Sequence, residues 1–191
     1  MRRLIKAHGP CELVPRKNSP YEALVAAVAH QQLNGKAAAS ILRRFKALFP
    51  GVRFPKPHQI IAAKDRTLRS AGFSFGKIRA IRDIAEKTRS GLVPTRAAAM
   101  KLSDDELIER LIQVHGVGRW TVEMLLIFTL GRKDVFPSDD FGVRNGFRVV
   151  MKLDDMPKPR ALREHAVRWT PYRTLAAWYL WRAADAEKTK T

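Results

Sequence analysis

Apolar residues recur along most of this chain three or four positions apart, and regular alternation of apolar and polar residues is nearly absent. One such stretch opens at Ser19–Pro20, because serine favours the N-cap and proline the first turn of a helix, and it runs to about Gln32. A second follows Asn34–Gly35 and ends at Pro50–Gly51. The spacing therefore predicts an all-α protein.

Turn-forming residues divide the rest of the chain into further helices. Short helices are expected near 57–63 and 65–71, and a longer one from Gly76 to Arg89, where Gly91 provides the stop. Others are expected from Ser103, which with Glu106 fits a capping box, from Trp120 to Leu130, from Asp139 or Asp140, from Pro157 to Arg168, and after Thr170–Pro171. About nine or ten helices result, and only the tail 187–191 is expected to be disordered.

The charge balance narrows the range of partners. The 191 residues include 36 Lys and Arg against 18 Asp and Glu, which gives a formal net charge of +18. Such a charge predicts a polyanionic partner, although a basic proteome or a merely solvated surface would produce it too. No apolar run approaches the ~20 residues that span a membrane, and no apolar signal core follows the basic N-terminus. We therefore expect a cytoplasmic protein, at the nucleoid if the source is bacterial, with no membrane partner.

Several kinds of metal and nucleotide chemistry lack the residues they need. Cys11 is the only cysteine, which excludes an intramolecular disulfide and a cysteine-ligated iron–sulfur cluster. The five histidines are scattered and form no close ligand pair, so a catalytic zinc site is not expected. The phosphate-loop motifs of nucleotide hydrolases and dinucleotide enzymes are missing as well. The chain is therefore expected to work without an obligatory cofactor.

Two glycines between amphipathic helices form the most informative local pattern. Gly116 and Gly118 can adopt backbone conformations that a side chain would hinder, so the turn can be tight and its amides bare. Bare amides next to the start of the following helix make an anion site that does not depend on base sequence. An ordinary turn between two helices would need the glycines only for chain reversal. The net charge and Arg119, directly after the second glycine, favour a phosphate site.

Four segments together resemble a known family. The segment Leu111–Thr121 looks like the hairpin of the helix-hairpin-helix (HhH-GPD) DNA glycosylase superfamily, and Asp134–Phe141 matches its Gly/Pro-rich loop and aspartate. Ala29–Ala38 and Arg168–Arg173 match further segments of the 3-methyladenine DNA glycosylase II branch, also called the AlkA family. The resemblance covers roughly residues 18–183, nearly the whole chain.

The resemblance implies an all-α, two-lobed glycosylase fold with the active-site cleft between the lobes. Residues 1–191 would form a single domain of the compact catalytic-core type, because the 17 residues before the first expected helix cannot hold the N-terminal β-rich domain of longer members. One lobe is expected to contain about 18–30 with the 103–191 region, its termini aside. The central lobe is expected at about 31–137, including the hairpin 103–130.

The resemblance assigns the catalytic role to one carboxylate. Asp140 matches the family's catalytic aspartate, while Asp139 matches its neighbour and is expected mainly to cap the following helix. Leu33 matches the residue that wedges into the base stack where the damaged nucleotide leaves, with Gln32 and Asn34 beside it.

A base pocket and a phosphate-binding hairpin are implied as well. Trp120 and Trp181 match aromatic positions of the pocket, and Met124 stands where some relatives carry an aromatic residue. The hairpin residues expected at the phosphate are His115, Gly116, Val117, Gly118, Arg119 and Thr121. In the family a monovalent cation, Na⁺ or K⁺, often sits on hairpin carbonyl groups, here those of Ile112, Val114 and Val117.

The chemistry of base excision agrees with this assignment. A base inside a duplex cannot be attacked at its glycosidic bond, so the nucleotide must swing out at a cost of roughly a few kcal/mol. As the base departs, positive charge builds on the deoxyribose, and a fixed carboxylate stabilises that charge and can orient a water molecule. An N-alkylated purine is already cationic and leaves without being protonated, while an indole face attracts it.

The resemblance therefore predicts a monofunctional DNA glycosylase that acts on double-stranded DNA, as a monomer, in base excision repair. Such an enzyme flips out and hydrolytically excises alkylated purines, namely 3-methyladenine and with it 7-methylguanine and 1-methyladenine. Members of the superfamily that also cut the strand carry a lysine at the position of Trp120, where it forms a Schiff base with the sugar. With tryptophan there, we expect no lyase activity.

Two other functions stay open. A non-catalytic helix-hairpin-helix DNA-binding module would use the same hairpin, but it would need neither an aspartate after the second helix nor a tryptophan-lined cavity. A mismatch or oxidised-base glycosylase would usually carry the lysine or the cysteine cluster that this chain lacks. Single residues also have plainer interpretations, with Trp178 and Trp181 as core, Asp140 as a helix cap, and Gln31–Gln32 as a solvated helix end.

Overall fold

The computed structural model describes residues 1–33 and 35–188, and within these ranges all regular structure is helical. The all-α prediction is confirmed. The chain divides into two compact units. We call Lys17–Leu125 the hairpin unit, and Met1–Arg16 together with the described residues from Leu126 onward the aspartate unit. Each unit is described by itself.

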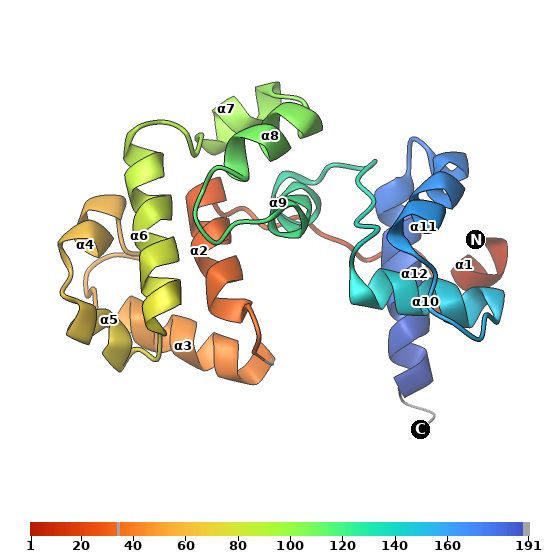
Figure 1. Ribbon diagram of the computed structural model, residues 1–191, viewed down its shortest axis with the longest axis horizontal. Coiled ribbons are helices and arrows are strands. Elements are labelled where there is room, and N and C mark those ends of the chain that lie inside the picture. The colour runs from red at the N-terminus through yellow and green to blue at the C-terminus, as the bar shows by residue number, and fades with distance from the viewer. Residues whose placement is uncertain (34, 189–191) are drawn as a thin grey trace. The chain divides into compact units, whose positions relative to one another are not determined.

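The hairpin unit is built around its longest helix, α6 (Phe75–Arg89). Helices α2, α4 and α5 pack against α6, and α2 also contacts α3 and α9 (Figure 1). Three isoleucines of α6 at helical spacing are buried, as the apolar pattern predicts: Ile78, Ile81 and Ile84. The other helices of the unit are α2 (Pro20–His30), α3 (Gly35–Ala47), α4 (Pro57–Ala62), α5 (Asp65–Ser70), α7 (Arg96–Lys101), α8 (Asp104–Leu111) and α9 (Arg119–Leu125).

Local capping chemistry sets the start of two of these helices. Ser19 Oγ accepts a hydrogen bond from the Glu22 amide at 3.2 Å, and the Glu22 carboxylate accepts one from the Ser19 amide at 3.0 Å. Ser103 and Glu106 form the same reciprocal pair at the start of α8, which confirms the predicted capping box.

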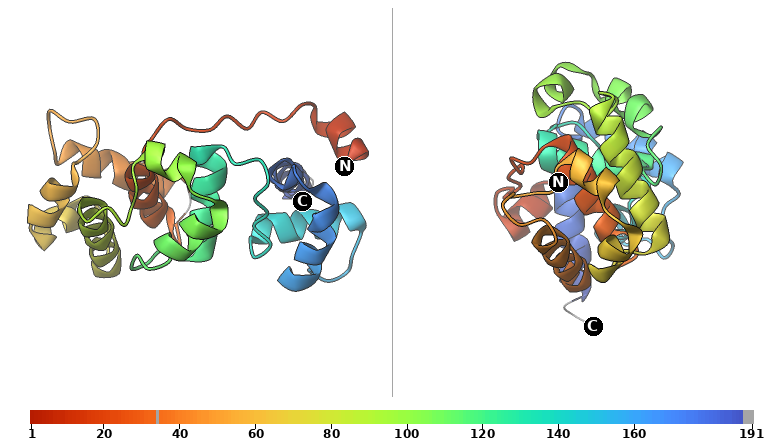
Figure 2. Two further views of the ribbon diagram at one scale, coloured as in Figure 1. Left: turned by 90° about the horizontal axis from the view of Figure 1, so that it is seen from above. Right: turned by 90° about the vertical axis from the view of Figure 1, so that its left-hand side faces the viewer.

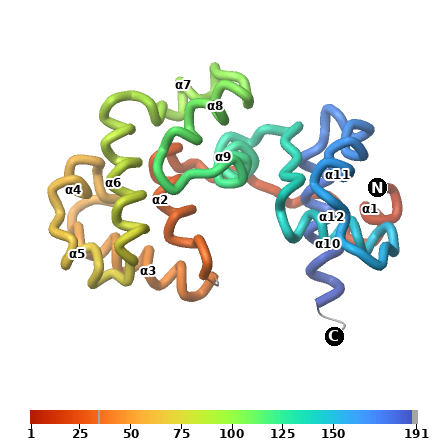
Figure 3. Tube along the Cα trace, viewed as in Figure 1, coloured from red at the N-terminus to blue at the C-terminus, as the bar shows by residue number. Residues whose placement is uncertain are grey.

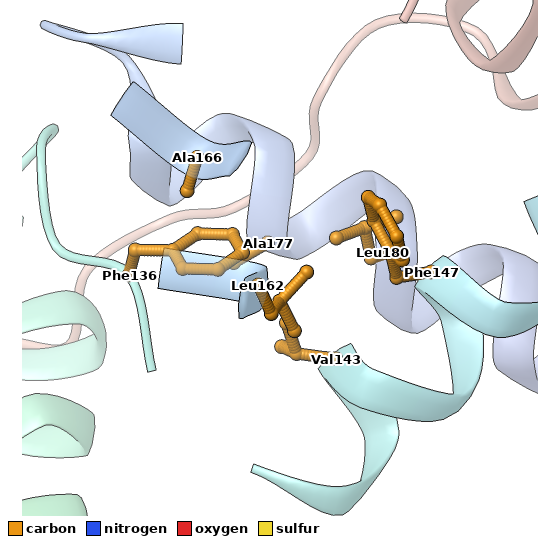
Figure 4. Packing of buried hydrophobic residues seen from close by; sticks show 7 residues of the cluster. All are labelled: Phe136, Val143, Phe147, Leu162, Ala166, Ala177 and Leu180. Carbon is orange, nitrogen blue, oxygen red and sulfur yellow. The ribbon is translucent and has the colours of Figure 1, made fainter. Parts of the chain in front are cut away.

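The aspartate unit packs α10 (Phe141–Met151) against α12 (Arg173–Lys188). Its other elements are α1 (Arg2–His8), a π-helical segment (Leu126–Leu130), α11 (Pro159–Ala166) and a 3₁₀ turn (Val167–Trp169). Figure 4 shows the apolar cluster that joins α10, α11 and α12, which consists of Phe136, Val143, Phe147, Leu162, Ala166, Ala177 and Leu180.

A glycine makes the close packing of α10 against α12 possible. A Cβ atom built on Gly146 would lie 1.9 Å from the carbonyl oxygen of Leu180, well inside any allowed contact. Gly142, one turn earlier on α10, likewise faces a side chain of α12. Two glycines four residues apart therefore form a flat strip on α10 against which α12 packs.

The helix boundaries differ from the predictions at four places. Helices α1 and α7 were not predicted, and residues 9–19 that follow α1 form no helix (Figure 2). The helix predicted for Trp120–Leu130 widens into a π-helical turn at Leu126. The predicted disordered tail begins too early, because Glu187 continues α12 and pairs with Arg148 at 2.9 Å. Residues 189–191 lie outside the described residues.

The observed division of the chain also departs from the predicted lobes. Helix α2 falls in the same unit as the hairpin, because it packs against α3, α6 and α9. The segment after Leu125 belongs to the other unit, although the hairpin region was expected to continue to residue 130. None of the described helices is long and apolar enough to cross a membrane.

Candidate active site

Asp140 is the N-cap of α10, and two N–H groups hold its carboxylate. Its Oδ1 accepts a hydrogen bond from the Val143 amide at 2.8 Å and another from the indole Nε1 of Trp181 at 2.7 Å. The first contact is local to the helix start, whereas the second comes from α12. Two donors on one oxygen fix the rotation of the side chain and so fix where the carboxylate points.

The indole of Trp181 is itself held on two sides. It stacks on Phe128 with ring centroids 5.6 Å apart and an angle of 27° between the ring planes. Below its other edge lies Gly142, where an added Cβ would approach Trp181 Cδ1 to 2.8 Å and Asp140 Oδ1 to 3.2 Å. Only a residue without a side chain at 142 therefore allows this approach of indole and carboxylate.

The loop that leads to Asp140 is tied to the start of α12. The guanidinium of Arg173 binds both carboxylate oxygens of Asp134, at 2.8 and 3.0 Å, and the Arg173 amide adds a third hydrogen bond. Chiefly the side-chain hydrogen bond from Arg173 lowers the pKa of Asp134 below its usual value. A further hydrogen bond joins the same loop to α12, because the Val135 amide donates to Thr174 Oγ1 at 3.0 Å. These contacts hold the loop that precedes Asp140 in one conformation.

Asp139 does not cap the helix, so that prediction is wrong. The amide of Val143 donates to Asp140, and Asp139 is an exposed residue whose carboxylate lies 3.9 Å from Arg163. Arg163 donates to the buried hydroxyl of Ser138 instead, at 3.1 Å. The register of the cap places the second aspartate of the pair at the helix start, because only its side chain reaches the amide three residues on.

The chain turns back between α8 and α9 (Figure 3). Some amides of this turn form hydrogen bonds within the protein. Gly116 adopts a positive φ of 77°, which glycine tolerates without strain. The His115 amide donates to Asp83 at 2.6 Å, and the Val117 amide donates to the Val114 carbonyl at 3.0 Å. The amides of Gly116 and Gly118 donate no hydrogen bond within the described residues. The amides of these two glycines are therefore open to a ligand.

The remaining hairpin residues differ in exposure. Arg119 is more than half exposed and donates to the buried carboxylate of Glu123 at 3.1 Å, one turn along α9. Thr121 is buried, so its hydroxyl is not offered to solvent. On the same helix Trp120 is 43% exposed, although it is a large aromatic residue, and Met124 is half-buried one turn further on. Trp120 and Met124 therefore lie on one side of α9.

The predicted wedge segment forms a turn after α2. Gln32 has a positive φ of 58°, which is uncommon for a residue with a side chain. Leu33 follows and is 41% exposed, as a residue that inserts into a base stack must be. Gln31 reaches the hairpin, because its Nε2 donates to the Gly116 carbonyl at 2.9 Å. Asn34, also predicted for the wedge, lies outside the described residues.

The structure thus brings the predicted site residues together as two groups. Asp140 and Trp181 are in contact within the aspartate unit. The predicted wedge turn and the hairpin turn are in contact within the hairpin unit, which also carries Trp120 and Met124. Among the described residues, no group of three His, Cys, Asp or Glu side chains could hold a metal ion.

Comparison with known proteins places this chain in a family. The family model described as HhH-GPD superfamily base excision DNA repair protein matches residues 25–171, more than half of the chain. The chain belongs to the HhH-GPD superfamily. The resemblance inferred from the hairpin and its aspartate is confirmed.

Relatives of this HhH-GPD protein are similar over most of its length. DNA-3-methyladenine glycosylase 1 of Schizosaccharomyces pombe is 49% identical over 91% of this chain and 77% of its own. The alkylbase DNA glycosidase-like protein mag2 of the same yeast is 38% identical over 94% of this chain and 85% of its own. A solved structure of the S. pombe 3-methyladenine DNA glycosylase Mag1 in complex with abasic DNA matches with a TM-score of 0.87 and 47% identity, covering 95% and 89% of the two chains.

Sequence reasoning missed several residues that position the site in this HhH-GPD protein. The spacing of Gly142 and Gly146 on α10 is a visible signal, because small residues four apart allow close helix packing. Asp83 and Lys77 gave no such signal, since charged residues on an amphipathic helix usually face solvent. Only the fold shows that they contact the two turns.

Proposed function

We propose that this protein is a DNA glycosylase that excises alkylated purines from double-stranded DNA in base excision repair, with 3-methyladenine as the main substrate and 7-methylguanine and 1-methyladenine as further substrates. The observation that carries the proposal is the double restraint on Asp140, whose Oδ1 accepts from Val143 and Trp181. A helix cap needs only the first of these bonds. The second adds the orientation that catalysis requires. The names of the similar glycosylases support the choice of substrate.

Asp140 acts on the sugar of an extruded nucleotide. When the glycosidic bond breaks, its electron pair leaves with the base and positive charge develops on the deoxyribose ring. The fixed carboxylate stabilises that charge and directs a water molecule to the anomeric carbon, where the new C–O bond forms as the water gives a proton to the carboxylate. Since an N-alkylated purine leaves as a neutral base, the reaction needs no general acid.

The hairpin and the wedge make the nucleotide accessible. The amides of Gly116 and Gly118 are available to donate to a DNA phosphate, whereas those of His115 and Val117 bond within the protein. Leu33 fills the space in the base stack that the extruded base leaves. Together these contacts offset the free energy of unstacking and unpairing, which is roughly a few kcal/mol.

The indole of Trp120 is suited to a cationic base. The residue is 43% exposed, so part of it is accessible to a ligand, and Met124 beside it adds an adaptable apolar surface. Trp178, in contrast, is a core residue that packs edge-to-face on Tyr179. A monovalent cation on the carbonyl groups of Ile112, Val114 and Val117 stays a prediction. The carbonyl of Gln113, between the first two, already accepts from Lys87.

One assay tests the proposed function. Methylated duplex DNA is incubated with the native protein, with Asp140→Asn and with Asp139→Asn, and free alkylbase is quantified by chromatography. Asparagine is also a good N-cap, so Asp140→Asn should fold, and Asp139→Asn is a control with the same change of charge. We expect release by the native protein and the control, and a rate at least about 100-fold lower for Asp140→Asn.

The same assay separates the alternatives. DNA binding without base release by any of the three proteins would indicate a non-catalytic helix-hairpin-helix module. Duplexes with an oxidised base or a mismatch are added as further substrates, and release from these but not of alkylated purines would indicate the other class of glycosylase. Equal release by native protein and Asp140→Asn would contradict the assignment of the carboxylate.

A further inference from the structure

One face of α6 contacts both turns that the proposed function places on DNA. Lys77, Ala80, Asp83 and Lys87 are spaced by three, three and four residues, so they form a stripe along one side of the helix. The first residue of the stripe binds the end of α2, and the other three contact the hairpin turn.

Lys77 binds the segment that leads into the wedge turn. Its Nζ donates to the carbonyl oxygen of Ala29 at 3.0 Å and to that of Gln31 at 2.9 Å. These carbonyl groups lie at the C-terminal end of α2, where a positive charge is favourable. Burial lowers the pKa of Lys77, but the two carbonyl groups accept from two of the three N–H donors of its ammonium group. The direction in which the chain leaves α2 toward Leu33 is therefore set by α6.

Asp83 and Lys87 bind the hairpin turn. Asp83 Oδ2 accepts from the His115 amide at 2.6 Å and from Lys87 Nζ at 2.9 Å, and Lys87 also donates to the Gln113 carbonyl. Burial raises the pKa of Asp83, yet the hydrogen bonds from Lys87 and His115 outweigh it and leave the pKa below its usual value. Ala80 lies directly below the turn, because a Cβ added to Gly116 would approach its Cβ to 2.9 Å.

The wedge turn and the hairpin turn also contact each other directly. The side chain of Gln31 donates to the Gly116 carbonyl at 2.9 Å, so the wedge turn and the hairpin turn bind each other as well as α6. Both turns contain a residue with positive φ, Gln32 and Gly116, and neither belongs to a helix. Their relative position thus depends on side-chain contacts rather than on continuous secondary structure.

We propose that Lys77 and Asp83 are positioning residues that hold the wedge turn and the phosphate-binding hairpin at a fixed separation, so that both engage one damaged nucleotide together. The proposal rests on the proposed function. If the two turns moved independently, binding at the second would require ordering at the time of contact, and part of the gain from the first would be lost. A rigid pair instead uses both contacts to oppose reclosure of the duplex.

Matched variants separate this role from a general contribution of α6 to the fold. Lys77→Met removes the contact of α6 with the end of α2, and Asp83→Asn weakens its contact with the hairpin turn. Asp65→Asn is the control for Asp83→Asn, because Asp65 of α5 also forms an ion pair with α6, at 2.5 Å from Arg82. Arg82 in turn donates a hydrogen bond to the carbonyl of Ala63, before α5. Lys64→Met is the control for Lys77→Met, since Lys64 is exposed and its side chain makes no capping hydrogen bond. Each control changes the net charge as its partner variant does.

The first measurement is the affinity for a duplex with a stable abasic-site analogue, relative to the same duplex undamaged. We expect Lys77→Met and Asp83→Asn to lower this ratio about tenfold, as loss of a charge-assisted hydrogen bond would, and the controls to keep the native ratio. Lys77→Arg keeps a cationic donor and should restore most of it. A merely structural role would lower the melting temperature and leave the ratio unchanged, which would overturn the proposal.

The second measurement is backbone amide hydrogen exchange of the free protein, which needs neither DNA nor catalysis. We expect faster exchange in the hairpin peptide 112–119 for Asp83→Asn, and also for Lys77→Met, although Lys77 does not touch that peptide. Unchanged hairpin exchange in Lys77→Met would contradict the proposed coupling. If the native protein released no base while the coupled exchange and the loss of selectivity persisted, the proposed function would fail and the positioning role would stand.

Discussion

Trp181 and Asp140 lie forty-one residues apart in the sequence, and the indole Nε1 of the first donates a 2.7 Å hydrogen bond to Oδ1 of the second. This bond joins α12 to the N-terminus of α10 at the carboxylate that we assign to catalysis. The tryptophan therefore orients the aspartate in addition to any contact it makes with a base. Changes to this hydrogen bond, or to the residues that hold its two partners in place, should therefore affect base release or stability.

Trp181→Phe should slow base release about ten- to a hundredfold while the protein stays folded, because the carboxylate loses the indole N–H donor. The stack on Phe128 can persist with a phenyl ring, so the melting temperature should change little. Single-turnover base release and thermal unfolding of the same preparation check this. Normal release by Trp181→Phe would show that Asp140 is oriented without the indole.

Gly142→Ala should reduce both base release and stability. Its methyl group would approach Trp181 Cδ1 to 2.8 Å, so the indole must move away from Asp140, at about 1–3 kcal/mol of unfolding free energy. Gly76→Ala is the control, because a Cβ there meets nothing within 4 Å and alanine is the better helix former. Chemical denaturation and single-turnover kinetics measure the two effects. Native-like kinetics in Gly142→Ala would contradict the fit described above.

Asp134→Asn should lower stability near neutral pH by about 1–2 kcal/mol, since the guanidinium of Arg173 loses its charged partner. Because the folded-state pKa of Asp134 lies below the unfolded value of about 4, the native pair contributes stability above that pH, and this stability disappears as pH falls through the folded pKa. Urea unfolding between pH 7 and pH 2 should therefore show a weaker acid dependence for the variant. Parallel curves would exclude the ion pair as the source.

Borohydride should trap no covalent adduct between this protein and abasic DNA. Trapping requires a Schiff base with an amine at the sugar, and the position where strand-cutting members of the superfamily have lysine is Trp120. Gel electrophoresis after reduction checks this, with a lysine-containing glycosylase as the positive control. A clear band with this protein would show that another amine reaches the sugar and that the enzyme is not monofunctional.

The sequence by itself determined the helical class, most helix positions and the family. Apolar spacing and capping residues act within a few positions along the chain, so helices such as α2, α6 and α8 could be predicted from local chemistry. The glycines of the hairpin and the aspartate beyond it carried the family resemblance. Short helices gave a weaker signal, so α1 and α7 were missed although α4 and α5, which are as short, were predicted.

Only the tertiary structure decided which residues orient the site. The contact of Trp181 with Asp140 depends on the packing of two helices over Gly142. Likewise, the structure shows that Asp83 accepts from the His115 amide, whereas the neighbouring glycine amides donate to no group of the described residues. The physical reason is the same in both cases. Hydrogen bonds between residues far apart in the chain form only where packing brings the backbone close, and no local pattern encodes that approach.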